Sequence, residues 1–279
     1  MRIEQALRWA QQELVGTESP SIDSRALLCH CLGESQSYLY TWPEREITAS
    51  HLERFMELVA QRKQGKPIAY LRGYQEFWSL TFNVSAATLI PRPETELIVE
   101  KTLALNNIDN PVILDLGTGT GAIAIALASE LPDADVIGVD KVPDAIALAK
   151  SNALLNQISN VTFMQSDWFS ALRNQTFNVI VSNPPYVESA SEYLAQGDVR
   201  FEPTSALTAG EDGLDDIHQI LAGASAHLTD NGILLMEHGF EQGVAVREIF
   251  ARHGFSDVTT IKDINLLDRV TFGRWCTCE

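Results

Sequence analysis

The sequence predicts an α/β protein in which a doubly wound, mostly parallel sheet follows a small N-terminal helical bundle. Three observations support this fold class. Short β-branched apolar runs alternate with helical stretches beyond about residue 89, a glycine-rich loop follows one of these runs, and the first seventy residues show only helical periodicity. A chain of 279 residues has room for one large domain and one small one. We expect a helical bundle over 1–72, a hairpin linker over 73–88 and the α/β domain over 89–279.

Three stretches of the first seventy residues repeat apolar side chains at helical spacing. They are Leu7, Trp9, Ala10 and Leu14, then Ala26, Leu27, Leu28 and Leu32, and then Leu52, Phe55, Met56, Leu58 and Val59. Turn-forming residues at 16–20 and 42–43 separate them. We interpret these apolar stripes as the core of a small bundle. The alternating, aromatic segment 73–86 that follows predicts a short hairpin.

The sheet is predicted from seven short runs rich in β-branched residues. They occupy 111–116, 135–139, 161–165, 177–182, 232–237 and a terminal pair near 256–261 and 268–275. The segment 122–128 is small and apolar, as expected of a helix pressed closely onto a sheet. Open α/β sheets bind ligands at the carboxyl ends of their strands, so the residues that follow each run form the candidate site.

A glycine-rich loop follows the first of these runs. Its residues are Gly117, Thr118, Gly119, Thr120 and Gly121. Glycine lets the backbone turn tightly and approach a ligand, and the N-terminus of the next helix offers unpaired amide donors. The loop therefore predicts a cradle for a nucleotide-type ligand. With Ala122 it also satisfies the G-x-G-x-x-A pattern, so a nicotinamide dinucleotide and S-adenosylmethionine (SAM) are both alternatives at this point.

Acidic residues follow the next two strands. Asp140 lies about twenty residues past the glycines, where a carboxylate binds a ribose, although Asp is also favoured as a helix cap. Asp167 suits an adenine amino group, and Trp168 beside it suits either stacking on the adenine or plain core packing. Asp115, in the first strand, is expected to order the glycine loop through main-chain amides.

The motif Asn183-Pro184-Pro185-Tyr186 follows the strand 177–182 directly. The two prolines stop the strand and fix the backbone. The Asn183 side-chain carbonyl and the Pro184 main-chain carbonyl can then converge on one planar amine, with Tyr186 over its face. The motif therefore predicts a site for an NH2 group. A dehydrogenase needs a proton donor such as His or Lys near its nicotinamide, and the absence of one at this strand end favours SAM.

This ordered set of motifs resembles the class I SAM-dependent methyltransferases. Four segments narrow the resemblance to bacterial peptide chain release factor glutamine methyltransferases. They are 73–78, 89–96, 166–169 and 199–203. The resemblance covers nearly the whole chain and implies a seven-stranded methyltransferase sheet. It also implies methyl transfer from SAM to the glutamine of the Gly-Gly-Gln loop of release factors, with S-adenosylhomocysteine as product and the helical domain helping to grip the release factor.

An amide nitrogen is a poor nucleophile, because its lone pair is delocalised into the carbonyl. Oxygen acceptors for both N–H bonds stabilise the positive charge that develops during methyl transfer, so no strong base is required. We expect Asn183, Pro184 and Tyr186 to be catalytic, and the same three residues with Pro185 to bind the substrate. The expected SAM-binding residues are Gly117, Thr118, Gly119, Thr120, Gly121, Asp140, Asp167, Trp168 and Asn183.

The charge balance favours a protein substrate over nucleic acid. The formal net charge is −17, from 20 basic and 37 acidic residues, and 12 basic and 28 acidic residues lie within 71–279. Phosphate-backbone binding needs clustered Lys and Arg, so we expect no direct nucleic-acid partner. The alternatives to a release-factor glutamine are a glutamine of a ribosomal protein and, less favoured, the N6 of adenine in nucleic acid.

No targeting or metal-binding pattern stands out. The segment 1–10 is an amphipathic helix without an apolar signal core, and no uninterrupted apolar run reaches the roughly twenty residues of a membrane span, so we expect a cytoplasmic protein. The pairs Cys29 and Cys31, and Cys276 and Cys278, lack the usual zinc spacing, so we expect no metal. His238 follows a strand end, and we interpret it as a structural histidine.

Overall fold

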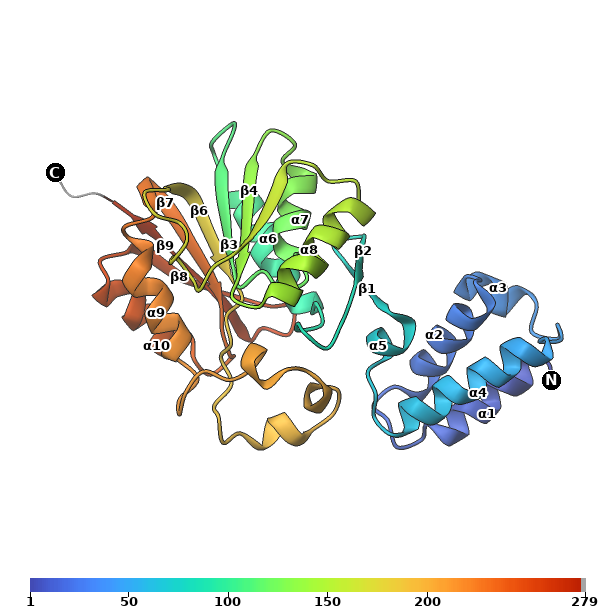
Figure 1. The fold of residues 1–279 in the computed structure, drawn as a ribbon. Helices are drawn as coiled ribbons and strands as arrows, with labels where there is room; N and C mark the ends of the chain where they lie inside the picture. Colours follow the sequence, from blue (N-terminus) through green and yellow to red (C-terminus); the bar gives the residue numbers. More distant parts are fainter. Residues whose placement is uncertain (277–279) are drawn as a thin grey trace. The chain divides into compact units, whose positions relative to one another are not determined.

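The structure is a computed structural model that describes residues 1–276. The described chain divides into two compact units, shown in Figure 1. The helical unit comprises residues 1–74 together with the short segment 195–201, and the sheet unit comprises 75–194 and the chain from 202 onward. A later segment of the chain is therefore part of the helical unit, which the sequence did not indicate.

The helical unit contains α1 (Ile3–Glu13), α2 (Pro20–Leu32), α3 (Gln36–Thr41), α4 (Ala49–Lys63) and α5 (Ile68–Arg72). Its buried core includes many of the predicted stripe residues, among them Leu14, Leu27 and Phe55. Met56 is an exception, because 42% of it is exposed. The prediction of a core position was wrong for Met56 because the buried face of α4 runs through Phe55, Leu58 and Val59, and Met56 lies about 100° around the helix from Phe55.

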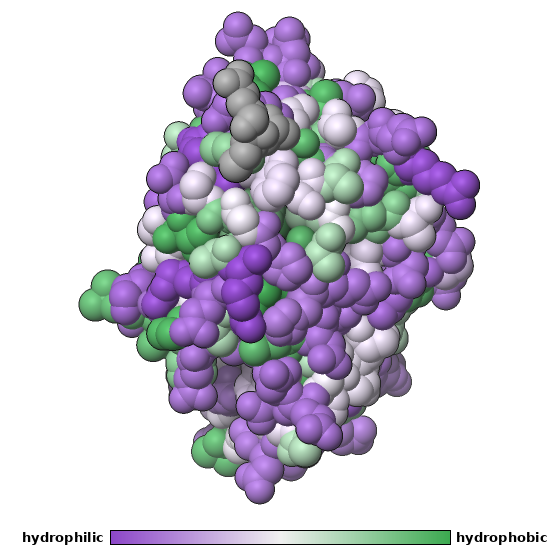
Figure 2. Space-filling view, turned by 90° about the vertical axis from the view of Figure 1, so that its left-hand side faces the viewer, coloured by the Kyte–Doolittle hydropathy of each residue, from purple (hydrophilic) through white to green (hydrophobic). Residues whose placement is uncertain are grey.

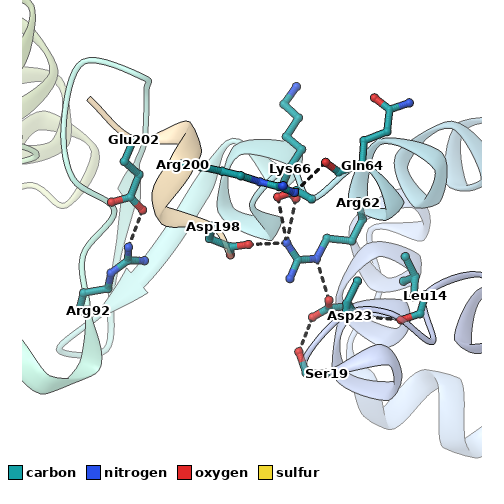
Figure 3. A network of polar contacts seen from close by, with 12 residues as sticks. Leu14, Ser19, Asp23, Arg62, Gln64, Lys66, Arg92, Asp198, Arg200 and Glu202 are labelled. Carbon is teal, nitrogen blue, oxygen red and sulfur yellow. Dashed lines mark hydrogen bonds and ion pairs between the residues drawn. The ribbon is translucent and has the colours of Figure 1, made fainter. Parts of the chain in front are cut away.

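A buried arginine holds the segment 195–201 in the helical unit (Figure 3). Arg62 of α4 donates from Nε to Asp23 of α2 at 2.8 Å and from Nη1 to Asp198 at 2.5 Å. Arg200 donates to the main-chain carbonyl of Gln64 at 3.0 Å. Because Arg62 is only 7% exposed, its charge depends on both carboxylates for compensation.

A two-stranded hairpin begins at the end of the helical unit. Its strands are β1 (Tyr74–Phe77) and β2 (Leu80–Asn83), which confirms the predicted hairpin. Asn152 of α8 (Pro143–Leu155) exchanges hydrogen bonds with the backbone of Asn83 at 2.8 and 3.1 Å. The same side chain donates to the carbonyl of Thr120 in the glycine loop at 2.9 Å, so one buried amide links the hairpin to the loop.

The sheet of the described chain has seven strands in the order β5-β4-β3-β6-β7-β9-β8. In sequence order they are β3 (Val112–Leu116), β4 (Asp135–Asp140), β5 (Val161–Gln165), β6 (Phe177–Ser182), β7 (Leu228–Glu237), β8 (Ser256–Lys262) and β9 (Asp268–Trp275). The first five pair in parallel, and β9 pairs antiparallel with β7 and β8. The predicted fold class, a mostly parallel seven-stranded sheet preceded by a helical bundle, is confirmed.

Helices cover both faces of this sheet (Figure 1). The helices α6 (Glu96–Leu105), α7 (Ala122–Glu130) and α8 pack with one set of strand side chains, and α9 (Asp215–Ala224) and α10 (Gly243–Arg252) pack with the other set. Neighbouring residues Ile113 and Leu114 of β3 belong to different cores, as the two-residue period of a strand requires.

The parallel register brings the ends of the central strands to one edge. Leu116 of β3 pairs with Val139 of β4 on one side and with Ser182 of β6 on the other. The glycine loop, Asp140 and Asn183 therefore leave the sheet side by side. Because β3 connects to β4 on one side while β6 returns on the other, this edge is also the topological switch point at which such sheets bind ligands.

The surface of the sheet unit on the side of α9 and α10 is shown in Figure 2. Hydrophilic side chains predominate there, and hydrophobic ones are dispersed among them. Within residues 1–276, no helix has both the length and the apolar character needed to cross a membrane.

Candidate active site

A cleft of about 940 Å³, its open mouth included, lies at the carboxyl edge of the sheet. Most of the predicted site residues line it: Gly117, Thr118, Gly119, Thr120, Asp140, Asp167, Trp168, Asn183 and Pro185. Three predicted residues of the described chain are not part of the cleft wall: Gly121, Pro184 and Tyr186. The structure therefore brings four strand ends to one cavity.

The glycine loop turns at three residues in the left-handed region. Gly117, Gly119 and Gly121 have φ of 71°, 55° and 83°. An added Cβ on Gly117 would lie 3.5 Å from the Trp168 ring, which is an ordinary van der Waals contact. The amides of Gly117 and Thr118 both donate to the carbonyl of Val139 at 2.9 Å. The loop therefore requires glycine because of its left-handed φ angles.

Asp140 holds the glycine loop in place. Its two carboxylate oxygens accept the amides of Gly119 at 3.0 Å and Val142 at 2.9 Å. The N-cap of α8 is Val142, so Asp140 lies just before the helix and does not cap it. Each oxygen keeps a second lone pair that can accept a hydroxyl proton from a ligand in the cleft.

Asp115 is fully buried behind the loop. It does not belong to the cleft wall that the described residues form. It accepts a hydrogen bond from the Thr118 hydroxyl at 2.6 Å. Burial raises the pKa of Asp115 to about 7, against the hydrogen bonds from Thr118 and the Ala124 amide. The expectation that Asp115 bonds the main-chain amides of the loop is therefore corrected: it bonds a loop side chain and an amide of α7, and the carboxylate bonded to a loop amide is that of Asp140.

Trp168 lies between the cleft and the core. It lines the cleft, where it could stack on a ligand, and it also packs against the hydrophobic cluster of α9 and α10. The ring therefore has both a cleft contact and a core contact. Its φ is 45°, an unusual value for a bulky residue, and Ser166 holds this turn by donating to the Trp168 carbonyl at 2.6 Å. Asp167 is exposed on the cleft wall beside the ring. This strained conformation places an aromatic face and a carboxylate at one end of the cleft.

Asn183 leaves β6 with its side chain anchored. Its Nδ2 donates to the Thr95 hydroxyl at 3.1 Å. Tyr186 is turned toward β7, where its hydroxyl donates to Glu237 at 3.1 Å, and burial raises its pKa. Glu237 is fully buried, and burial raises its pKa to about 6 despite hydrogen bonds from Thr95 and Tyr186 and the positive charge of Arg269.

Sequence reasoning missed several residues of this site. Thr95 and Arg92 line the cleft, and Arg92 donates to the buried Glu202 at 2.6 Å. Arg92, Thr95 and Glu202 lie in segments that carry the family resemblance, and that signal could have identified them. Glu237 ends an apolar strand next to β6, so its position at the carboxyl edge of the sheet was a usable signal as well.

The remaining polar candidates have structural surroundings. His238 is buried, and its ring nitrogens bond the Gly239 carbonyl at 2.9 Å and the Thr271 hydroxyl at 2.8 Å, which confirms a structural role. Burial lowers its pKa. In the part of the chain that is described, the cysteines Cys29, Cys31 and Cys276 are free and no His/Cys/Asp/Glu cluster could hold a metal ion. Cys278 lies outside the described residues.

The cleft fits SAM by the chemistry of its groups. Two carboxylates at adjacent strand ends suit ribose hydroxyls and an adenine amino group, and the Trp168 ring suits stacking. The glycine-rich turn before α7 lines the same cleft and leaves room for the amino-acid part of the cofactor. The seven-stranded sheet with this cleft at its carboxyl edge defines a SAM-dependent methyltransferase.

Comparisons with known proteins give the family. Residues 5–73 match the model of the PrmC N-terminal domain, and residues 108–260 match a methyltransferase domain. Release factor glutamine methyltransferases of Shewanella oneidensis and Escherichia coli are 48% and 47% identical to this chain, over 98% and 99% of it and 96% and 99% of the relatives. A solved methyltransferase of Pyrococcus furiosus shares the fold, with a TM-score of 0.55 at 19% identity over 82% of this chain and all of that one. The chain therefore belongs to the release factor glutamine methyltransferase family.

Proposed function

We propose that this protein transfers the methyl group of SAM to the side-chain amide nitrogen of the glutamine in the Gly-Gly-Gln loop of peptide chain release factors. The observation that carries the proposal is the anchored Asn183, which lies on the wall of the SAM-type cleft with its NH2 group bonded to Thr95. Its carbonyl oxygen is then the free end of the amide. The NH2 group of a substrate amide needs a hydrogen-bond acceptor such as this carbonyl oxygen at the cleft wall.

The proposed cofactor contacts follow from the strand ends. Asp140 binds the ribose, Asp167 binds the adenine amino group, and Trp168 stacks on the adenine. The methionine part of the cofactor lies against the glycine loop, whose residues line the cleft. SAM supplies an electrophilic methyl group when it is bound, and the role of the chain is to hold the acceptor nitrogen in line with it.

The acceptor contacts stabilise charge rather than remove a proton. The Asn183 side-chain oxygen and the Pro184 carbonyl accept hydrogen bonds from the two N–H groups of the substrate amide. These N–H groups become more acidic as the nitrogen is methylated. Pro185 contributes to the wall, whereas Tyr186, which we assign to the amide face, lies outside the wall and bonds Glu237. Orientation of the reacting atoms in such a site can contribute about 7–11 kcal/mol. The released proton passes to water or a neighbouring group.

We assign recognition of the release factor in part to the helical unit. Its segment 195–201 lies between the Asn-Pro-Pro-Tyr motif and the cleft residues Ser205 and Ala206 in the chain. The bonds of Asp198 and Arg200 to this unit therefore restrain the chain on both sides of the segment. A folded release factor should react much better than a short Gly-Gly-Gln peptide, because remote contacts supply the binding energy that orients the nitrogen.

The proposal places the reaction in the cytoplasm, where release factors act, and excludes nucleic acid as the direct partner because the part of the chain after residue 70 is strongly acidic. Labelled SAM should be incubated with purified release factors, ribosomal proteins and duplex DNA in parallel. Label in a release factor, lost when its Gly-Gly-Gln glutamine is replaced by alanine, supports the assignment. Label in adenine or in a ribosomal protein alone contradicts it.

A further inference from the structure

The environment of Asn183 contains a second layer of polar residues that determines which end of its amide faces the cleft. Thr95 is the last residue of a short 3₁₀ turn (Pro93–Thr95), and Glu237 is the last residue of β7. The pairing of Ser182 with Met236 brings Asn183 and Glu237 to the same level of the sheet. Thr95 is 5% exposed and is part of the cleft wall, and Glu237 is 1% exposed and lies behind that wall.

The direction of the hydrogen bonds follows from Glu237. An ionised carboxylate can only accept. Glu237 receives the Tyr186 hydroxyl at 3.1 Å, and the nearby Thr95 hydroxyl is a second donor that lowers its pKa. Thr95 has a single proton, so its oxygen is left as an acceptor. The neighbour of that oxygen at 3.1 Å is therefore the NH2 end of Asn183, and the carbonyl end must point away from it.

We propose that Glu237 and Thr95 are positioning residues for methyl transfer: through a directional chain of hydrogen bonds they fix Asn183 with its carbonyl oxygen toward the substrate amide. The inference rests on the proposed function, because an amide acceptor requires an oxygen rather than an NH2 group at this point. With the amide rotated by 180°, Asn183 would present a donor to a donor, and the transition state would lose one of its acceptors. Glu237 also fixes Tyr186 from the same carboxylate.

The charge state of Glu237 makes this arrangement sensitive to pH. The groups that face it are the hydroxyls of Thr95 and Tyr186, the guanidinium of Arg269 and the carboxylate of Glu94. Burial raises the pKa of Glu237 to about 6, so the carboxylate is ionised above that pH and becomes protonated below it. A protonated Glu237 can donate to Thr95, which frees the Thr95 proton for Asn183 and allows the amide to reverse. Turnover should therefore fall as the pH decreases through about 6.

The test compares Thr95→Val with Thr95→Ser and with a matched control. Valine keeps the volume and removes the hydroxyl, whereas serine retains it. Thr102→Val is the control, because Thr102 is buried on α6 and its hydroxyl has no hydrogen-bond partner within the described chain. Single-turnover methylation of a release factor should slow about 10- to 100-fold in Thr95→Val, the range seen when residues that orient metal ligands are removed. Thr95→Ser and Thr102→Val should stay within about threefold of wild type, and SAM affinity by calorimetry should be unchanged in all three.

The pH profile separates positioning from simple support of the fold. Glu237→Gln should have a reduced rate and should lack the acid limb that wild type shows near pH 6. Wild-type turnover in Thr95→Val, or an unchanged acid limb in Glu237→Gln, would overturn the proposal, and Glu237→Gln alone decides it if Thr95→Val does not fold. A wild-type enzyme that labels no release factor would instead remove the proposed function.

Discussion

Replacement of Asp140 by alanine should weaken SAM binding without unfolding the sheet unit. The carboxylate accepts two main-chain amides, at 3.0 Å from Gly119 and 2.9 Å from Val142, and the proposal adds the ribose hydroxyls. A hydrogen bond to a charged group contributes about 1.5–3 kcal/mol. At 1.4 kcal/mol per factor of ten, the SAM dissociation constant should rise about tenfold to 150-fold. Asp140→Asn retains one acceptor oxygen and should give an intermediate loss.

Isothermal calorimetry measures this loss, and circular dichroism checks the fold. The matched control is Asp144→Ala, which removes an exposed carboxylate from the first turn of α8 and leaves the cleft wall intact. Asp144→Ala should bind SAM as wild type does. If folded Asp140→Ala keeps wild-type affinity, Asp140 is not a ribose ligand. If both variants weaken binding equally, the effect is one of general charge and the assigned contact is wrong.

Asn183→Ala should lower single-turnover methylation by about 10²–10³, the loss that follows removal of one preorganised polar group, while SAM affinity changes much less; a wild-type rate would refute the acceptor mechanism. Asp198→Asn leaves the buried Arg62 with one carboxylate, and because Asp198 is 35% exposed the free energy of unfolding of the helical unit should fall by only about 1–2 kcal/mol in thermal melts. In that variant, release-factor methylation should fall more than SAM binding, and an equal loss of both would contradict the assigned role of segment 195–201. Replacement of Cys276 and Cys278 by serine should leave activity intact, and native mass spectrometry should find no metal; a stoichiometric zinc signal would overturn this expectation.

The strands of the sheet were predictable because their apolar runs end in strong signals. Glycines follow β3, an aspartate ends β4 and prolines follow β6, and each predicted run lies within about a residue of an observed strand except at the start of β7. That strand begins four residues earlier than predicted, at Leu228. The polar residues Thr229, Asp230 and Asn231 interrupt the apolar pattern there, and Asn231 has a left-handed φ of 58° where the register between β7 and β6 shifts.

The cleft wall was predictable where it follows strand ends, and it was missed where other segments fold over it. Arg92 and Thr95 precede the sheet in the chain and reach the cleft only through the tertiary fold. The same limit applies to the segment 195–201, whose place in the helical unit depends on Arg62, more than a hundred residues away in sequence. Local periodicity contains no information about such contacts, and Met56 shows that a stripe can also include one exposed apolar residue.

The central claim is that the substrate atom is an amide nitrogen held by Asn183 at the cleft. Tandem mass spectrometry of a folded release factor, after a single turnover with the wild-type enzyme and with Asn183→Ala, tests it most directly. We predict one added methyl group on the side-chain nitrogen of the Gly-Gly-Gln glutamine with wild type, and at most a trace with the variant. A methyl group on any other residue, or equal modification by both enzymes, would contradict the account.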